Sequence, residues 1–189
     1  MSGFTVVLDA CVLYPAPLRD LLLSIATAGI YRAKWSQQIH DEWTRNLLAN
    51  RPDLDPMRLK ATCTRMNTSV PDSLVTGYED LIKSLQLDDP DDRHVLAVAI
   101  RTDADVIVTF NQKDFDEHEL NKYGVYTEHP DEVVHNMINT HTPKLLSAVR
   151  EMRIRLRKPA KTVQEYLDTL YSQGLPQTVS KLAEYGDAI

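Results

Sequence analysis

The sequence contains few cysteines and no long apolar run. Its 189 residues include two cysteines, Cys11 and Cys63, which form no Cys-x-x-Cys pair. Cysteines so few and so far apart provide no disulfide framework, which indicates a reducing, cytoplasmic location. No apolar stretch reaches the roughly 18 residues that a membrane-spanning helix requires. The N-terminus also lacks the basic region and cleavage site of a signal peptide, so we expect a protein without membrane contact.

Motifs of several large enzyme classes are absent too. The sequence has no GxxxxGK[ST] loop and no GxGxxG fingerprint, which argues against binding of nucleoside triphosphates and dinucleotides. It has no GxSxG elbow of a serine hydrolase. The net charge is −6, and aromatic residues make up 7% of the chain. Neither value favours a general attraction to nucleic acid, so any such contact must come from a local patch.

Apolar segments alternate between strand and helix patterns over the first part of the chain. Short, β-branched apolar runs predict strands at 4–8, 105–109 and 125–127. Apolar residues at helical spacing, together with good first residues such as Ser36 and Pro130, predict helices between them. Strands that alternate with helices indicate a central parallel sheet covered on both faces. The predicted fold class is therefore α/β, a three-layer α/β/α sandwich.

The pattern changes near residue 140, after which every segment is typical of a helix. Residues 144–157 form an amphipathic stretch, and Thr162 with Glu165 fits a capping box at the start of another helix. We therefore predict two parts. An α/β domain covers 1–140, and a small all-helical C-terminal extension covers 141–189.

Acidic and amide side chains follow the predicted strands or begin helices, far apart in the sequence. Asp9 ends the first strand, Asn111 and Asp114 follow the strand at 105–109, and Asp92 opens an apolar helix. In an open α/β sheet, ligands bind beyond the carboxyl ends of the strands. Carboxylates that converge there without basic neighbours repel one another unless a cation lies between them. The pattern therefore predicts a Mg²⁺ or Mn²⁺ site and phosphodiester chemistry.

Each acidic candidate also has a purely structural interpretation. Asp9 can cap the turn after its strand, and Asp92 can be the N-cap of the helix that follows it. Asn111 and Asp114 fit Asx turns. Glu42 lies within a predicted helix, and its spacing from the apolar residues there favours the solvent-facing side. Because each signal is weak alone, the hypothesis depends on their joint placement.

This joint placement resembles one protein family. Residues 4–13, FTVVLDACVL, are similar to the opening strand of PIN domains, and Asp41-Glu42 resembles the acidic helix of their second motif. The most specific part is 90–97, PDDRHVLA, followed by 108–115, VTFNQKDF. Over roughly residues 3–138, the chain resembles PIN-domain ribonucleases of the VapC-like toxin group.

The resemblance implies a Mg²⁺- or Mn²⁺-dependent endoribonuclease that is the toxin of a type II toxin–antitoxin system. By position, Asp9, Glu42 and Asp92 match the first three acidic metal ligands of the family. Many relatives have an acid where this chain has Asn111, and Asp114 lies three residues later as an outer catalytic acid. Since Asn111 adds no charge, we expect one well-occupied ion. The resemblance also implies an RNA substrate, a small antitoxin partner and a homodimer.

Neighbouring residues are candidates for supporting roles. Thr109 can donate a hydrogen bond to an acidic ligand or serve as a β-branched strand residue. Arg93 can contact RNA phosphate or pair with the acidic loop beside it. A basic strip over 144–161 holds seven basic residues and one acid. Three of its arginines are predicted to share one helical face that contacts RNA phosphates or is merely solvated: Arg150, Arg153 and Arg157.

Two other functions stay open from the sequence. A phosphatase with an aspartate nucleophile requires a second acid two residues after the first, where this chain has Cys11. A catalytically inactive PIN-like scaffold or RNA-binding protein is compatible with Asn111. Metal-dependent RNA cleavage distinguishes the nuclease from both alternatives.

Overall fold

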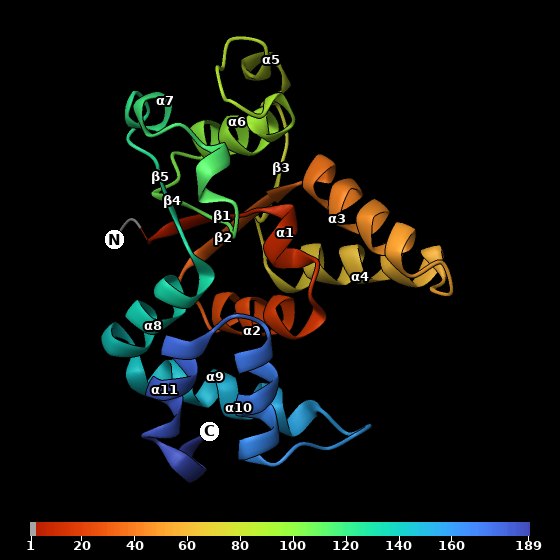
Figure 1. Cartoon of the computed structure of the whole chain (residues 1–189), viewed down its shortest axis with the longest axis vertical. Coiled ribbons are helices and arrows are strands. Elements are labelled where there is room, and N and C mark those ends of the chain that lie inside the picture. The colour runs from red at the N-terminus through yellow and green to blue at the C-terminus, as the bar shows by residue number, and fades with distance from the viewer. Residues whose placement is uncertain (1–2) are drawn as a thin grey trace.

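The fold is built around a five-stranded parallel sheet (Figure 1). The computed structural model describes residues 3–189. The strands are β1 (Thr5–Leu8), β2 (Arg32–Ser36), β3 (Leu74–Val75), β4 (Val106–Val108) and β5 (Tyr126–Glu128). Their spatial order is β3-β2-β1-β4-β5, and every neighbouring pair is parallel. The chain moves outward from β1 to β2 and β3, then returns to β4 on the other side of β1.

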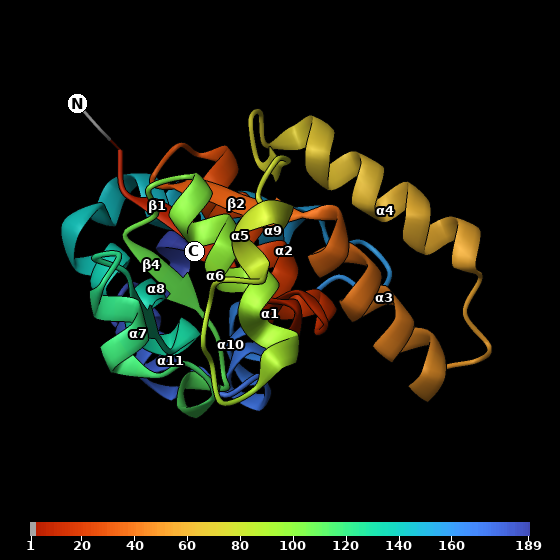
Figure 2. The same cartoon turned by 90° about the horizontal axis from the view of Figure 1, so that it is seen from above.

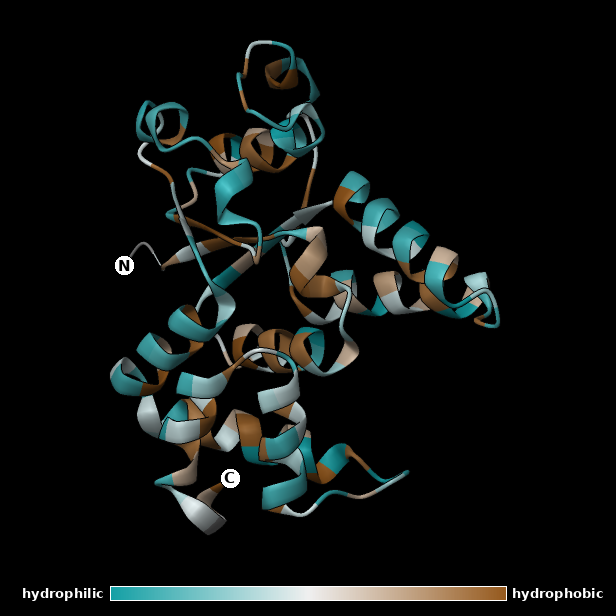
Figure 3. Ribbon diagram, in the orientation of Figure 1, coloured by the Kyte–Doolittle hydropathy of each residue, from teal (hydrophilic) through white to brown (hydrophobic). Residues whose placement is uncertain are grey.

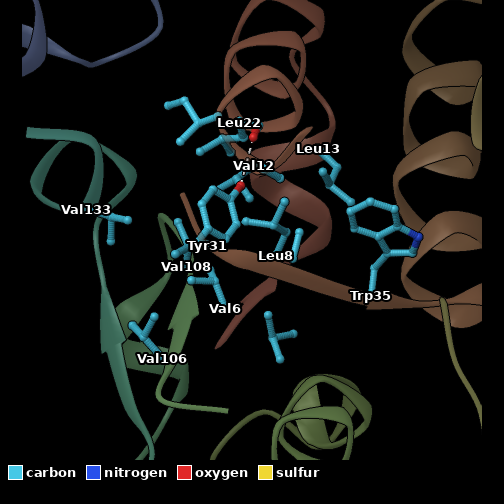
Figure 4. Packing of buried hydrophobic residues seen from close by; sticks show 14 of the residues in the cluster. Val6, Leu8, Val12, Leu13, Leu22, Tyr31, Trp35, Val106, Val108 and Val133 are labelled. Carbon is cyan, nitrogen blue, oxygen red and sulfur yellow. Dashed lines mark hydrogen bonds between the residues drawn. The ribbon is translucent and has the colours of Figure 1, made fainter. Parts of the chain in front are cut away.

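Successive side chains of the central strands point to opposite faces of the sheet, and both faces are buried. Val6 and Leu8 lie in register with Val106 and Val108. Figure 4 shows these side chains packed beneath Leu22, a residue of the helix layer on that side. The strand residues between them point to the opposite face. All are fully buried, so helices cover both faces, as the continuous apolar runs of parallel strands require.

Helices form a layer on each side of the sheet (Figures 1 and 2). One layer holds α5 (Glu79–Ile82), α6 (Arg93–Arg101) and α7 (Glu117–Asn121), and the other holds α2 (Ala16–Thr27) and α8 (Pro130–Thr140). Figure 3 shows apolar segments concentrated in α2 and α6. The predicted three-layer α/β/α sandwich is confirmed. None of the helices within residues 3–189 has both the length and the hydrophobicity needed to cross a membrane.

Three further helices lie close to the carboxyl ends of the strands. A single turn, α1 (Ala10–Leu13), directly follows β1. The hairpin of α3 (Gln37–Asn50) and α4 (Pro56–Ser69) extends away from the sheet (Figure 2). Ser36 begins α3 as predicted, because its hydroxyl accepts a hydrogen bond from the backbone N–H of Ile39 at 3.2 Å. This cap fixes the start of the helix that carries Glu42.

The C-terminal helices pack against the α/β part of the chain. They are α9 (Thr142–Arg155), α10 (Val163–Ser172) and α11 (Pro176–Ala183). Both α9 and α10 contact α2, and α11 contacts α8. Their buried residues belong to the same hydrophobic core as the sheet. The all-helical C-terminal segment is therefore present, while the division of the chain at residue 140 stays a prediction.

Two strands, β2 and β3, escaped the sequence analysis. Arg32 and Lys34 interrupt the apolar pattern of β2 with charges. The guanidinium of Arg32 donates to the hydroxyl of Thr5 at 2.7 Å, and the ammonium of Lys34 donates to the carbonyl of Asp72. The β3 strand has two residues, too few to show any periodicity. Contacts with β1 rather than local hydrophobicity determine that this region is extended.

A buried carboxylate joins the C-terminal helices to the rest of the fold. Asp131 of α8 is 2% exposed. Its carboxylate accepts hydrogen bonds from the backbone N–H groups of Gln177 at 2.9 Å and Thr178 at 2.8 Å. These donors belong to the first turn of α11, where N–H groups have no partner within the helix. Asp131 therefore anchors the positive end of α11.

Replacing Asp131 with alanine should destabilise the fold, because a buried backbone donor would lose its acceptor. We expect the free energy of unfolding, measured by urea denaturation, to fall by about 2–3 kcal/mol. Asp168→Ala is the matched control, since the Asp168 carboxylate accepts from the exposed side chain of Gln164 at 2.8 Å. That variant should lose less than about 0.5 kcal/mol. Equal losses in the two variants would contradict this role of Asp131.

Candidate active site

The predicted acidic site lies where the order of the strands reverses. Asp9 directly follows β1, and Thr109 directly follows β4, its neighbour in the sheet. The backbone N–H of Asp9 donates to the carbonyl of Val108 at 3.2 Å, which joins the two strand ends. Successive connections leave β1 and β4 in opposite directions across the sheet, which opens a crevice between their ends. Ligands of open α/β sheets bind at such a point.

Asp9 is held in a cage of hydrogen-bond donors. It is 3% exposed. Its Oδ1 accepts from the backbone N–H of Ala10 at 2.6 Å, and its Oδ2 accepts from the hydroxyl of Thr109 at 2.7 Å and the thiol of Cys11 at 3.1 Å. Burial raises the pKa of Asp9, and the donors act in the opposite direction. Thr109 therefore donates to an acidic residue, as one of its two interpretations predicted.

Asp92 and Glu42 reach the same place from different elements. Burial, followed by the negative charges of Asp9, Asp89, Asp114 and Glu42, raises the pKa of Asp92 to about 7. After burial, the largest contributions to this shift all come from acidic side chains. Glu42 is 27% exposed and faces the cluster, so its expected solvent-facing orientation was wrong. The structure thus brings carboxylates from distant segments within electrostatic range of one another.

His94 is a partner of Glu42 that the sequence analysis missed. Its Nε2 lies 3.1 Å from the Oε2 of Glu42, and the histidine is 3% exposed. Its Nδ1 has no hydrogen-bond partner among the described residues. The other buried residues of α6 are apolar, and a buried histidine among them needs a specific polar partner. A single histidine among the apolar residues of α6 is the signal that would have pointed to a contact such as that between His94 and Glu42.

The other residues of the acidic motifs differ in their placement. Asp92 occupies the N-cap position of α6 but makes no side-chain capping bond, so its interpretation as a cap was wrong. Asp89 caps the preceding turn instead, by accepting from a backbone N–H at 2.8 Å. Asp114 is half-buried and close enough to raise the pKa of Asp92. Asn111 is exposed and lines the adjoining cavity.

The side chains of the cluster have the chemistry that a divalent cation requires. Carboxylates are the hard oxygen ligands that Mg²⁺ prefers. Within residues 3–189, no three Asp, Glu, His or Cys side chains stand together as a preformed metal site. Mg²⁺ keeps several waters and needs only one or two direct carboxylates. A cation here would also offset the repulsion that raises the pKa of Asp92.

The predicted basic face for RNA is not formed. Helix α9 ends before Arg157, which lies in a bridge beyond the helix. The guanidinium of Arg153 donates to two backbone carbonyls at 3.2 and 2.9 Å, so it serves the fold. The prediction of one helical face shared by Arg150, Arg153 and Arg157 was therefore wrong, because the helix is shorter than expected. Arg150 is exposed, and Arg93 is half-buried with an Nε that has no partner in the described region.

Comparison with known proteins agrees with this geometry. A family model of the PIN domain matches residues 5–113, which span β1 to β4 and the acidic cluster. The chain belongs to the PIN-domain family. A second model, that of the VapC50 C-terminal domain, matches residues 130–184 of this PIN-domain protein. This match begins at the first residue of α8.

One relative of this PIN-domain protein matches a large share of both chains. The protein named "Putative ribonuclease VapC50" of Mycobacterium tuberculosis is 34% identical over 128 residues, which cover 66% of this chain and 75% of the relative. No solved structure matches the chain significantly. The predicted membership of the VapC-like group is confirmed by these matches.

Mn²⁺ should stabilise this PIN-domain protein. At concentrations far above the dissociation constant we expect a melting temperature about 5–10 °C higher, measured by differential scanning fluorimetry. At about pH 8 the Asp92 carboxyl is ionised, so Asp92→Asn should raise the melting temperature without metal and remove most of the response to Mn²⁺. The control is Asp91→Asn, an exposed neighbour, which should change neither value. A full Mn²⁺ response in Asp92→Asn would place the ion elsewhere.

The hydroxyl of Thr109 should strengthen metal binding through Asp9. Thr109→Val removes this donor with little change of volume, and we expect Mn²⁺ affinity, measured by calorimetry, to fall about 10-fold or more. Thr109→Ser keeps the hydroxyl and should retain most of the affinity. Wild-type affinity in the valine variant would show that Asp9 needs no support from Thr109.

Proposed function

We propose that this chain is a Mg²⁺- or Mn²⁺-dependent endoribonuclease and the toxin of a type II toxin–antitoxin system. The convergence of Asp9, Glu42 and Asp92 at the switch point of the sheet carries this proposal. Carboxylates concentrated at one point are what a site for a hard cation and a phosphodiester requires. Membership of the VapC-like group and the name of the mycobacterial relative support the same activity.

Asp9, Asp92 and Glu42 would hold the ion, and Asp114 would add to the negative field around it. Once bound, such an ion supplies a water of lowered pKa and neutralises charge on the attacked phosphate. The residues around the ligands prepare them for this task. The donors from Thr109 and Cys11 fix the direction of the Asp9 carboxylate.

His94 and Cys11 have supporting rather than reactive roles in this scheme. His94 orients Glu42 through the contact at 3.1 Å. Burial, followed by the charge of Asp9, raises the pKa of the Cys11 thiol far above its ordinary value. The thiol therefore stays protonated and donates to Asp9 instead of attacking a substrate.

A small antitoxin would inhibit the enzyme by placing a basic side chain among these carboxylates. Such a side chain would offset the negative charges that act on Asp92. Arg93 and Arg150 are the proposed contacts to RNA phosphates, since Arg153 is engaged within the fold. A homodimer is the assembly that we propose from the family.

Purified protein should cleave cellular RNA when Mn²⁺ is present. Asp9→Asn and Asp92→Asn should each lose about a thousandfold of this activity, because each weakens the ion that stabilises the transition state. Asp88→Asn, at an exposed position of the same acidic loop, should keep wild-type activity. Sequencing of cleaved RNA ends after brief expression, with Asp92→Asn for comparison, identifies the target.

Two results would count against the nuclease. Cleavage of equal strength in excess chelator would indicate a contaminating enzyme. RNA binding without cleavage by the wild-type protein in Mn²⁺ would favour the alternative, a catalytically inactive PIN-like RNA-binding protein.

A further inference from the structure

A cavity of about 460 Å³ adjoins the acidic cluster on the side of α1 and α3. Its lining includes Tyr14 at the end of α1, Asn46 and Asn50 on α3, and Asn111 after β4. Glu42 belongs to both the cavity and the acidic cluster. The cavity is therefore a continuation of the candidate active site rather than a separate site.

One face of α3 leads from the acidic cluster into this cavity. Glu42, Asn46 and Asn50 follow one another at intervals of four residues, which places their side chains in a row on one side of a helix. Ala49 lies on the same side and leaves room beside them. A substrate group next to one bound at Glu42 would thus meet amide side chains along α3.

The cavity is suited to a flat, uncharged group. Tyr14 is half-buried, and its hydroxyl accepts a hydrogen bond from the Nδ2 of Asn50 at 3.1 Å, which restrains the ring. Asn46 and Asn111 are exposed at the cavity and offer both donors and acceptors. Among residues 3–189, none of those that line the cavity is basic. A phosphate would therefore find no counter-charge there and would be repelled by Glu42.

A nucleobase meets each of these conditions. Its faces stack on aromatic rings, and its edge carries the donors and acceptors that amides complement. We propose that this cavity binds the base of one unpaired nucleotide next to the phosphate handled by the acidic cluster. Tyr14 stacks on the base, and Asn46 and Asn111 contact its edge. The proposal rests on the proposed nuclease function, because that function places a phosphate beside Glu42.

The position of the cavity favours an unpaired base. A base that is paired and stacked within a duplex must leave the stack before it enters a pocket between two helices. An unpaired base in a loop or single strand enters without that cost. The amides around the cavity then influence which base is preferred.

The test is RNA binding measured by fluorescence anisotropy, with Ca²⁺ in place of Mn²⁺ to separate binding from cleavage. The probes are fluorescein-labelled homopolymers of each of the four bases, as single strands and as annealed duplexes. Wild type should bind single strands more tightly. Tyr14→Ala should weaken single-strand binding roughly 10-fold to 100-fold and leave duplex binding unchanged. Tyr14→Phe keeps the ring and should retain most of the affinity.

Asn46→Ala supplies an independent measurement of the same proposal. Because Asn46 is exposed and its side chain supports no core residue, this variant should fold normally. It should change the order of affinity among the four homopolymers. An unchanged order would remove Asn46 from the base contact and contradict the proposed subsite.

The outcomes separate the subsite from the nuclease. Mn²⁺ stabilisation that persists in Tyr14→Ala shows that the fold and the acidic cluster are intact in that variant. Two results for Tyr14→Ala would then refute the subsite: equal weakening of single-strand and duplex binding, or no weakening of either. Both results leave the cleavage activity standing. If wild type never cleaves RNA but shows the Tyr14-dependent preference for single strands, the nuclease is refuted and the base subsite is supported.

Discussion

Mutual repulsion among carboxylates gathered around the buried Asp9 is the constraint around which this end of the sheet is organised. Burial and the charges of nearby acids such as Asp9 and Glu42 together raise the pKa of Asp92 to about 7. Folding therefore assembles a cluster whose ionised form is unfavourable in isolation. A hard divalent cation turns the same arrangement into a favourable one. The cost of the cluster without an ion is the physical reason for assigning it a functional rather than a structural role.

The rest of the fold keeps these carboxylates in place. The apolar strands β1 and β4 put Asp9 and Thr109 side by side, and their hydrogen bond at 2.7 Å ties the two strand ends together. Aromatic packing holds the residue that follows Thr109. The ring of Phe110 packs against His129, at the start of α8, with centroids 5.1 Å apart. Gly174 of the C-terminal segment lies close to the ring of Phe110.

The sequence predicted the parts of the fold that local hydrophobicity determines. Strands β1, β4 and β5 were found because their residues are apolar or β-branched, whereas β2 carries charges that only tertiary contacts satisfy. Asp9 and Asp92 were identified from their positions at element ends. The inward orientation of Glu42 was not predicted, because it depends on a contact with His94 of another helix, which the periodicity of α3 does not show. The end of α9 before Arg157 likewise depends on contacts that helical periodicity does not show.

A crystal structure of the protein grown with Mn²⁺ tests the central claim most directly, because anomalous scattering locates the ion without reference to activity. The account predicts an anomalous peak between the carboxylates of Asp9 and Asp92, with Glu42 turned toward it. A peak elsewhere on the molecule, or no peak between these side chains at saturating Mn²⁺, would contradict it.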